Sequence, residues 1–598
     1  MSAAPPPGVE AAPVPGLTDE ELERAAHGPD PAAALGPRLA GLLERLRELA
    51  ATGEPGPALM AEVMSLYNAA AHVLLYLDEI GATDALAALA PLRARLHEDP
   101  ELDARLAALL AATECREEDA ERARREHLGQ LRDAGRRAAA DRELAARLTA
   151  LHRARAGLLA ARRALLARLG VPDAARPDDA LRALLARVPS PATRTKLGRA
   201  WRGTAAAHLA PLVEAYDGVV AARRAAARQA GFPSPLARTL GPTGPAPEVV
   251  ETFLADHLRH GLAARDALEA ELRAEAGPSA EVDDHLDLLL GARSPKAPRL
   301  AADDCLERAC RLLGPAFGLE LAVTHGPFRP FPALRASRDG RPVGLVYVDV
   351  WDAPHKAHAA HHTTGVRNRT DWPGLTQPPV AFVSCRFPRD ADGGRAITLG
   401  NARSLLHELG HALHQLLLAG RLPFGSGIEY LPPHAREALP AWCEGWVHHD
   451  AFTGATEAVR WARWRLSCEF RRGALERAAV AWLDFAVHRA EHGGLGEALE
   501  RLEDRFGVLA RCEAPALVVS LTQAAHVEVA GGTFMYPWGR ALGAAAFAAT
   551  TGPEGPLPGA AAEALRPCLT PGAPSRVPSV DALFAPHAAG TLAGPEPR

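Results

Sequence analysis

Residues 405–417, with the sequence LLHELGHALHQLL, constrain the fold of this chain more than any other stretch. The leucines recur at three- and four-residue spacing, which predicts an α-helix with one buried face. Three histidines and one glutamate share this helix. Burying unpaired imidazoles and a carboxylate beside leucines is costly, so they need a partner. We therefore expect a core helix that carries a polar site, with Asn401 or Ser404 as its N-cap.

The rest of the chain divides by its texture into three parts. Residues 1–35 are rich in proline and alanine without periodicity, which predicts a disordered tail. Residues 36–320 carry leucines at helical spacing, separated by turns that contain proline or glycine, and predict a helical lobe. Residues 321–590 combine short strands with further helices and contain the histidine-bearing helix. We expect this third part to form the catalytic region.

Three short stretches near the start of this third part have the pattern of β-strands. They are LELAVTHG (319–326), RPVGLVYVDVWD (341–352) and PPVAFVSCRF (378–387). Each is rich in β-branched or aromatic residues and is bounded by Gly, Pro or Asp. A helical pattern returns after residue 400. The sequence therefore predicts a small sheet beside the histidine-bearing helix in a mainly helical protein.

His407 and His411 are four residues apart, so on a helix they project from one face, about 6 Å apart along the axis. Both imidazoles can then bind one zinc ion at about 2.0–2.1 Å. Glu408 lies one position round the helix and can accept a proton from water without binding the metal. This is the HExxH arrangement. The alternative is a set of core histidines with ordinary hydrogen bonds; the leucine face, the strands and the acidic residues that follow favour a metal site.

The third metal ligand has two candidates. Glu429 lies near the spacing of thermolysin-like zincins but is flanked by loop-forming Gly and Pro. Glu437 lies where a second helix is expected to begin, and we favour it. His414 is two turns from His407, about 10 Å along the axis, so we expect it to pack beside the site rather than coordinate. The metzincin pattern needs a histidine at position 417, which is Leu417 here.

Together these residues resemble the M3 family of zinc metallopeptidases, the thimet oligopeptidase and oligopeptidase F group. Residues 405–417 are close to the zinc-helix signature of that family. There the third ligand is a glutamate followed by an acidic residue seven positions later and a tryptophan nine positions later. Glu437, Glu444 and Trp446 match these offsets, whereas the family's proline is shifted by one to Pro440.

Upstream, the stretch VYVDVWDAPHKAHAAHH (346–362) resembles the family's segment that runs from an aspartate to a lysine, here Asp349 and Lys356. This stretch contains four histidines. We expect them to line the substrate site or to face solvent, and a second metal site is the alternative. They are His355, His358, His361 and His362.

The resemblance weakens in the stretch AHVEVAGGTFMYPWGRAL, residues 525–542. In the family this segment supplies a histidine and several tyrosines that bind substrate and stabilise the oxyanion. The resemblance implies these roles for His526 and Tyr536. The loop is shorter here, however: the tyrosine that follows the two glycines is missing, and Phe534 takes the place of the adjacent tyrosine. Loss of one oxyanion donor can lower the rate by about two to three orders of magnitude.

The overall composition excludes several classes of partner. The chain of 598 residues has 67 basic and 72 acidic residues, which predicts no nucleic-acid partner. There is no run of about 20 apolar residues and the N-terminus lacks the pattern of a secretory signal, so we expect no membrane segment. Eight scattered cysteines without a CxxC pair favour a reducing compartment. We expect a cytoplasmic monomer.

The sequence and the resemblance together predict a mainly α-helical, two-lobed zincin with a small β-sheet beside the HExxH helix and a deep central channel. The resemblance implies a zinc-dependent oligopeptidase that hydrolyses internal bonds of short peptides. One Zn²⁺ would be held by His407, His411 and Glu437, with Glu408 as general base. An extended substrate would add to the edge of the strand around 379–387. The alternatives are a divergent zinc protein, specialised for one peptide or for non-hydrolytic chemistry, and a non-catalytic helical binding protein.

Overall fold

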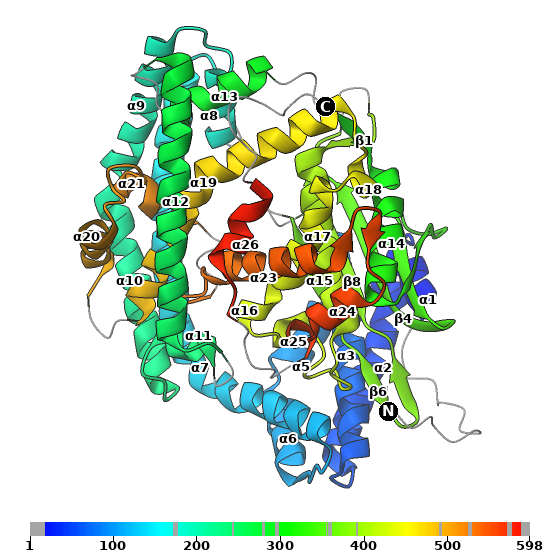
Figure 1. The fold of residues 1–598 in the computed structure, drawn as a ribbon. Coiled ribbons are helices and arrows are strands. Elements are labelled where there is room, and N and C mark those ends of the chain that lie inside the picture. The colour runs from blue at the N-terminus through cyan, green and yellow to red at the C-terminus, as the bar shows by residue number, and fades with distance from the viewer. Residues whose placement is uncertain are drawn as a thin grey trace.

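The computed structural model describes residues 18–171, 177–241, 244–277, 282–293, 298–354, 356, 361–389, 393–489, 493–523, 529–570 and 577–587. Helices make up most of these residues and surround one small sheet (Figure 1). The expectation of a mainly helical protein with a small sheet is confirmed.

The N-terminal helices pack against one face of the sheet. They are α1 (Asp19–Ala26), α2 (Pro31–Thr52), α3 (Pro57–Glu79), α4 (Thr83–Ala88), α5 (Ala90–His97) and α6 (Pro100–Ala112). Their buried leucines share one hydrophobic core with Tyr347 and Phe382 of the sheet. Two of these helices begin inside the stretch 1–35, where composition predicts a tail. A capping box between Thr18 and Glu21 starts α1, and Leu22 is buried.

Helix α3 is the one described helix that is long and apolar enough to cross a membrane by length and composition. In the structure, 67% of its apolar window is buried inside the molecule. Its polar residues contact the segment that joins β5 to β8: Ser65 Oγ lies 2.9 Å from Thr370 Oγ1, and Asn68 Nδ2 donates to Gln377 Oε1 at 2.8 Å. Burial against the protein itself therefore accounts for its apolar composition.

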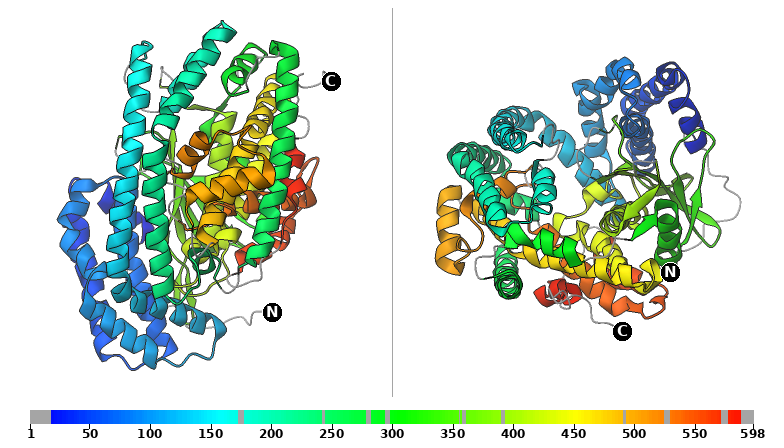
Figure 2. Two further views of the ribbon diagram at one scale, coloured as in Figure 1. Left: turned by 90° about the vertical axis from the view of Figure 1, so that its left-hand side faces the viewer. Right: turned by 90° about the horizontal axis from the view of Figure 1, so that it is seen from above.

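A second group of helices stands apart from the sheet. It comprises α7 (Glu118–Arg168), α8 (Pro177–Leu185), α9 (Pro191–Ala207), α10 (Leu209–Gln229), α11 (Pro235–Leu240), α12 (Pro247–Ala276) and α13 (Val282–Arg293). The long helices α7 and α10 run side by side, and α12 stands upright at a distance from them (Figure 2). Their core includes Leu212, Tyr216 and Phe253 and continues into the helix Glu457–Arg489, called α19.

The main sheet has the strand order β2-β3-β4-β8-β5. Its strands are β2 (Glu320–Thr324), β3 (Ala333–Arg338), β4 (Arg341–Trp351), β5 (His362–Arg367) and β8 (Val380–Phe387). The pair β4–β8 is parallel and the other pairs are antiparallel. The short strands form two-stranded pairs: β1 (Arg299–Ala301) with β9 (Ala396–Thr398), β6 (Thr370–Trp372) with β7 (Leu375–Gln377), and β10 (Thr551–Gly552) with β11 (Gly555–Pro556).

The three predicted strands are confirmed as β2, β4 and β8, but the expected edge strand is wrong. Strand β8 lies between β4 and β5 and is hydrogen-bonded on both sides along residues 380–384. The edge of the sheet on this side is β5, which the sequence pattern does not predict as a strand. Its local sequence, HTTGVR, follows a histidine-rich stretch and carries little of the apolar pattern of a strand.

The histidine-bearing helix is α15 (Leu399–Leu417). It shares one hydrophobic core with α14 (Ala302–Phe317). Its N-cap is Thr398, whose side chain accepts a hydrogen bond from the Asn401 N–H at 3.1 Å, so the expected caps Asn401 and Ser404 are wrong. The helix starts earlier because β9 leads directly into it.

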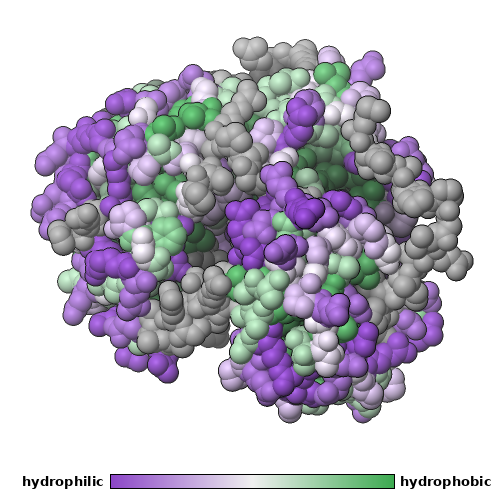
Figure 3. All heavy atoms as spheres, turned by 90° about the horizontal axis from the view of Figure 1, so that it is seen from below, coloured by the Kyte–Doolittle hydropathy of each residue, from purple (hydrophilic) through white to green (hydrophobic). Residues whose placement is uncertain are grey.

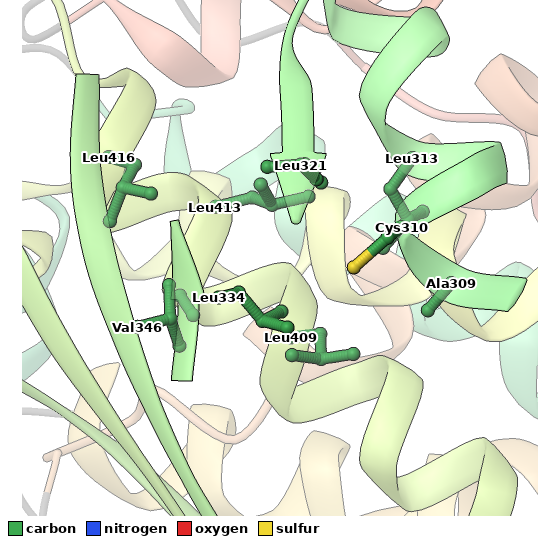
Figure 4. A pocket seen from close by; sticks show the side chains of 10 residues that line it. Ala309, Cys310, Leu313, Leu321, Leu334, Val346, Leu409, Leu413 and Leu416 are labelled. Carbon is green, nitrogen blue, oxygen red and sulfur yellow. The ribbon is translucent and has the colours of Figure 1, made fainter. Parts of the chain in front are cut away.

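The leucine face of α15 is buried as expected. Leu409, Leu413 and Leu416 point at side chains of α14, β2, β3 and β4 around an apolar cavity of about 10 Å³ (Figure 4). Cys310 and Val346 line its other walls. With one face fixed on the sheet, the helix presents its histidines on another side.

The remaining elements follow α15 in the chain. They are η1 (Ile428–Tyr430), α16 (Pro433–Arg436), α17 (Ala438–Glu444), η2 (Gly445–His448), α18 (Asp450–Thr453), α19, α20 (Leu495–Phe506), α21 (Ala514–Leu521), α23 (Met535–Thr550), α24 (Ala560–Ala564), α25 (Arg566–Leu569), α26 (Val580–Phe584) and η3 (Ala585–His587). Helix α17 lies between α15 and α23, and α26 touches both α12 and α23 (Figure 1). The division of the chain at residue 320 stays a prediction.

Candidate metal centre

The structure brings His407, His411 and Glu437 together. One donor atom from each lies within 4.8 Å of the others, and this is the one such group found among the described residues. His407 Nε2 is 3.5 Å from Glu437 Oε2, and His411 Nε2 is 3.7 Å from Glu437 Oε1. Ligand atoms around a tetrahedral zinc ion lie about 3.3 Å apart, given bonds of about 2.0–2.1 Å. The two separations from Glu437 are close to this spacing, so the three side chains could hold one ion.

Close packing of two helices sets this spacing. A Cβ atom at Gly410 would lie 2.4 Å from Pro440 Cα and 2.8 Å from Pro440 N, so only glycine lets α15 approach α17 this closely. On the other side, a Cβ at Gly539 of α23 would lie 2.4 Å from Glu437 Cβ. Glu437 is thus held between α15 and α23 at the junction of α16 and α17.

Glu444 orients the first histidine. Its Oε1 atom lies 2.7 Å from His407 Nδ1, which leaves His407 Nε2 to face Glu437. A carboxylate on the far nitrogen fixes the tautomer of a metal-binding imidazole and makes it a stronger ligand. In the sequence, Glu444 stands out only as the acidic residue seven positions after Glu437. Its distance of seven residues from Glu437, two helical turns, is the signal that places both carboxylates on one face.

The site strongly perturbs the protonation of its members. Burial lowers the pKa of His407, but the hydrogen bond to Glu444 and the neighbouring carboxylates outweigh it and raise the pKa to about 9. Burial drives the pKa of His411 well below its usual value, so this imidazole is neutral and keeps a lone pair for a metal. Burial raises the pKa of Glu437, against the opposing effect of His407. A divalent cation would offset this crowding of buried carboxylates, so the donor set fits a metal ion.

Glu408 lies beside the group without belonging to it. Its Oε2 atom accepts a hydrogen bond from Thr363 Oγ1 at 2.8 Å, and Thr363 is on the edge strand β5. Burial raises the pKa of the Glu408 carboxyl, with His407 and Thr363 acting in the opposite direction. A buried carboxylate with a raised pKa suits a group that accepts a proton near neutral pH.

The alternative ligand Glu429 lies elsewhere. Its carboxylate accepts a hydrogen bond from Asn368 Nδ2 at 2.6 Å, within a buried amide network that includes Gln415. His414 is completely buried, and burial lowers its pKa to about 3, so it packs as a neutral ring. Both observations agree with the preference for Glu437 and with a packing role for His414.

Of the two candidates for stabilising the oxyanion, the structure describes only Tyr536. His526 lies outside the described residues. Tyr536 is in the first turn of α23, three residues before Gly539, which packs against Glu437. Phe534, which takes the place of a family tyrosine, is fully buried against Trp538 in the core that α19 shares with α12.

The upstream histidine stretch is only partly described. His355 and His358 lie outside the described residues. His361 Nδ1 accepts the Arg386 backbone N–H at 3.0 Å, and His362 Nε2 lies 3.1 Å from Glu79. The ends of the resembling segment meet, because Lys356 Nζ lies 3.1 Å from the Asp349 carboxylate.

Part of the chain is similar in sequence to known peptidases. Residues 330–435 match the family described as Peptidase family M3. This match contains His407, Glu408 and His411 and ends two residues before Glu437. The oligopeptidase A of Salmonella typhimurium is 33% identical over 128 residues, and that of Escherichia coli is 30% identical over 128 residues. Each aligned stretch covers 21% of this chain and 18% of the relative, so the similarity spans about a fifth of either protein.

Solved structures extend the similarity to the whole fold. A structure described as an oligoendopeptidase F has a TM-score of 0.55 at 15% identity, covering 93% of this chain and 94% of the other. Pz peptidase A with an inhibitor has a TM-score of 0.56 at 14% identity, covering 93% and 95%. A peptidase from Chlamydophila abortus has a TM-score of 0.54 at 12% identity, covering 97% and 92%. Residues 330–435 of the chain therefore match Peptidase family M3, and the chain as a whole shares the fold of these solved structures.

Proposed function

We propose that this protein is a zinc-dependent oligopeptidase that hydrolyses internal bonds of short peptides. The observation that carries the proposal is the convergence of His407, His411 and Glu437 within 4.8 Å, beside the buried carboxylate of Glu408. These three residues would hold one Zn²⁺. When bound, zinc supplies a Lewis acid that polarises a peptide carbonyl and makes water more acidic.

The chain's own residues would carry the proton transfers. Glu408, oriented by its hydrogen bond from Thr363, would take a proton from the attacking water and give it to the leaving amine. Glu444 would keep His407 in one orientation throughout. Tyr536 and His526 are our candidates for donors to the oxyanion. An extended peptide would add to the free edge of β5, where Thr363 touches the proposed base.

A restriction to short peptides would follow from the shape of the molecule. Seen from below, a notch separates two parts of the surface (Figure 3). We infer two lobes with a channel between them, and the proposed ligands are recessed: the side chains of His407 and His411 are 20% and 12% exposed. We also propose a reducing, cytoplasmic compartment, because the eight cysteines are scattered along the sequence without a CxxC pair. We further propose that the protein acts as a monomer.

Comparing the wild type with Glu408→Gln tests the proposal. The wild type should cleave members of a quenched-fluorescent peptide panel, and mass spectrometry should locate the cuts at internal bonds. The variant should keep one zinc ion per chain but lose at least about 99% of the rate, as expected for a general base. A zinc-loaded wild type that cleaves no peptide, or a variant that cleaves as fast as the wild type, would contradict hydrolysis and favour a zinc protein with another task.

A further inference from the structure

The edge strand β5 directs its side chains alternately towards two helices. Thr363 faces α15, where its Oγ1 atom donates to Glu408 Oε2 at 2.8 Å and lies 3.0 Å from the Glu408 carbonyl oxygen. Neighbouring side chains of a strand point to opposite faces of the sheet. His362 and Thr364, on either side of Thr363, therefore point to the face that the N-terminal helices cover.

The pairing of β5 with β8 agrees with these two faces. Thr363 is opposite Val383, which belongs to the hydrophobic core around α15. Thr364 is opposite Phe382, which belongs to the core of the N-terminal helices. A shift of β5 by one residue would exchange the two faces and take Thr363 away from α15. The hydrogen bond from Thr363 to the proposed base therefore depends on the register of β5.

Glu79, the last residue of α3, contacts both residues that flank Thr363. Its Oε1 atom accepts a hydrogen bond from Thr364 Oγ1. Its two carboxylate oxygens lie 3.1 Å and 3.2 Å from His362 Nε2. The side chain of Glu79 is only 7% exposed. One buried carboxylate thus contacts β5 at two positions, on the face opposite the proposed base.

The end of α3 is an unfavourable place for a carboxylate without partners. Negative charge at the C-terminal end of a helix opposes the helix dipole, and burial adds the cost of removing water. Replacing a buried ionic pair by apolar side chains is often neutral or stabilising, so stability alone does not require Glu79. Its two contacts instead fix β5, which ends the sheet in the described part of the chain and has only β8 as a paired neighbour there.

We propose that Glu79 is a positioning residue for peptide hydrolysis: it fixes β5 so that Thr363 stays hydrogen-bonded to Glu408. This rests on the proposed function. Glu79 acts through the strand, and α3 thereby contributes to the arrangement of the site from the far face of the sheet. Displacing a catalytic group by about 1 Å can lower a rate by about 100-fold. Because the pairing with β8 still holds the strand for an added peptide, the loss of Glu79 should lower kcat and leave KM almost unchanged.

Steady-state kinetics on one cleaved peptide of the quenched-fluorescent panel tests this role. Glu79→Ala should lower kcat at least about tenfold and change KM by less than about threefold. Glu79→Gln should recover most of the loss, because its amide oxygen still accepts the Thr364 hydroxyl. Thr364→Val, which leaves the carboxylate in place, should lower kcat by a smaller factor. Glu62→Ala is the matched control, because Glu62 is on the same helix but lies 3.6 Å from Arg45, and it should keep the wild-type kcat.

A double-mutant cycle shows whether the effect passes through Thr363. Thr363→Val removes the hydroxyl that donates to Glu408 and keeps the shape of the side chain. In this background, Glu79→Ala should lower kcat by less than about twofold, because the hydrogen bond that it disturbs is already gone. A general structural defect would lower kcat by the same factor in both backgrounds. Zinc content, measured for each variant, checks that the metal centre is intact.

Hydrogen–deuterium exchange measures the hold of Glu79 on β5 without catalysis. Residues 362–367 should exchange at least about tenfold faster in Glu79→Ala than in the wild type, and at the wild-type rate in Glu62→Ala.

Two results would overturn the proposal: a zinc-loaded Glu79→Ala variant with the wild-type kcat, or an equal loss of kcat in both backgrounds of the cycle. In either case the protein still cleaves peptides, and the peptidase assignment stands alone. The proposed function fails differently. A wild type that hydrolyses no peptide, although Glu79→Ala speeds exchange over residues 362–367, keeps the contact of Glu79 with β5 and loses both the peptidase assignment and the catalytic role of Glu79.

Discussion

Glu444 and His407 form the closest polar contact at the proposed metal centre, with 2.7 Å between Glu444 Oε1 and His407 Nδ1. Replacing Glu444 with glutamine should weaken zinc binding by about 10- to 100-fold, because the imidazole loses a charged partner that fixes its orientation. Competition with a fluorescent chelator would measure the affinity. Glu429→Gln is a control, since Glu429 contacts Asn368 and not the histidines. An unchanged zinc affinity in Glu444→Gln would remove Glu444 from the site.

The contact between Gly410 and Pro440 predicts a second effect. Gly410→Ala adds a methyl group that would lie 2.4 Å from Pro440 Cα, so α15 and α17 must separate and Glu437 must move from the histidines. We expect a loss of zinc affinity of at least about tenfold, together with lower stability. Gly400→Ala on the same helix is the matched control, because the nearest atom to its Cβ lies at 3.7 Å. Equal zinc affinity in the two variants would contradict the packing argument.

The leucine face of α15 predicts a stability effect. Leu413 is 3% exposed and borders the apolar cavity beside the sheet, so Leu413→Ala should lower the free energy of unfolding by about 2–5 kcal/mol. Leu417→Ala should cost less, because Leu417 is only partly buried. Urea unfolding followed by circular dichroism would compare them. A larger loss of unfolding free energy in Leu417→Ala than in Leu413→Ala would contradict the claim that the buried leucine face stabilises the helix.

His257 of α12 predicts a dependence of stability on pH. Burial, aided by Arg477, His260 and Arg540, lowers its pKa to about 3, below the unfolded value of about 6.5. The folded state therefore holds it neutral. Its contribution to stability is complete above pH 6.5 and is lost as the pH falls towards 3, by up to about 1.4 kcal/mol per unit. Urea titrations at pH 7, 6 and 5 would give the free energy of unfolding of each protein. This free energy should fall less steeply with decreasing pH in His257→Leu than in the wild type, and the same pH dependence in both would refute the prediction.

The sequence predicts the site better than its surroundings. The spacing of His407 and His411, and the leucines between and around them, specify a helix and its buried face locally, because the period of 3.6 residues is written in the chain. Glu437 could be favoured over Glu429 because proline and glycine mark the loop around the latter. In the structure Glu437 lies with the two histidines and Glu429 lies with Asn368; the metal-binding roles themselves stay proposals.

Features that depend on distant parts of the chain were harder to predict. The sequence predicts β8 as the edge strand, whereas the edge strand in the structure is β5. The order of strands in a sheet is set by non-local pairing, which no single stretch of sequence encodes. The start of α15 was misplaced because β9, which pairs with β1 nearly a hundred residues earlier, fixes Thr398 as its cap. Composition predicts a tail over residues 1–35 because it takes no account of the order of residues, and the capping box at Thr18 depends on that order.

Metal analysis of the purified protein tests the central claim most directly. We expect one zinc ion per chain in the wild type by plasma mass spectrometry, and less than about a tenth of that in His411→Ala and in Glu437→Ala after dialysis against a weak chelator. Glu429→Ala should keep the full amount. A wild type that binds no divalent metal, or a Glu437→Ala variant that retains stoichiometric zinc, would contradict the three-ligand centre.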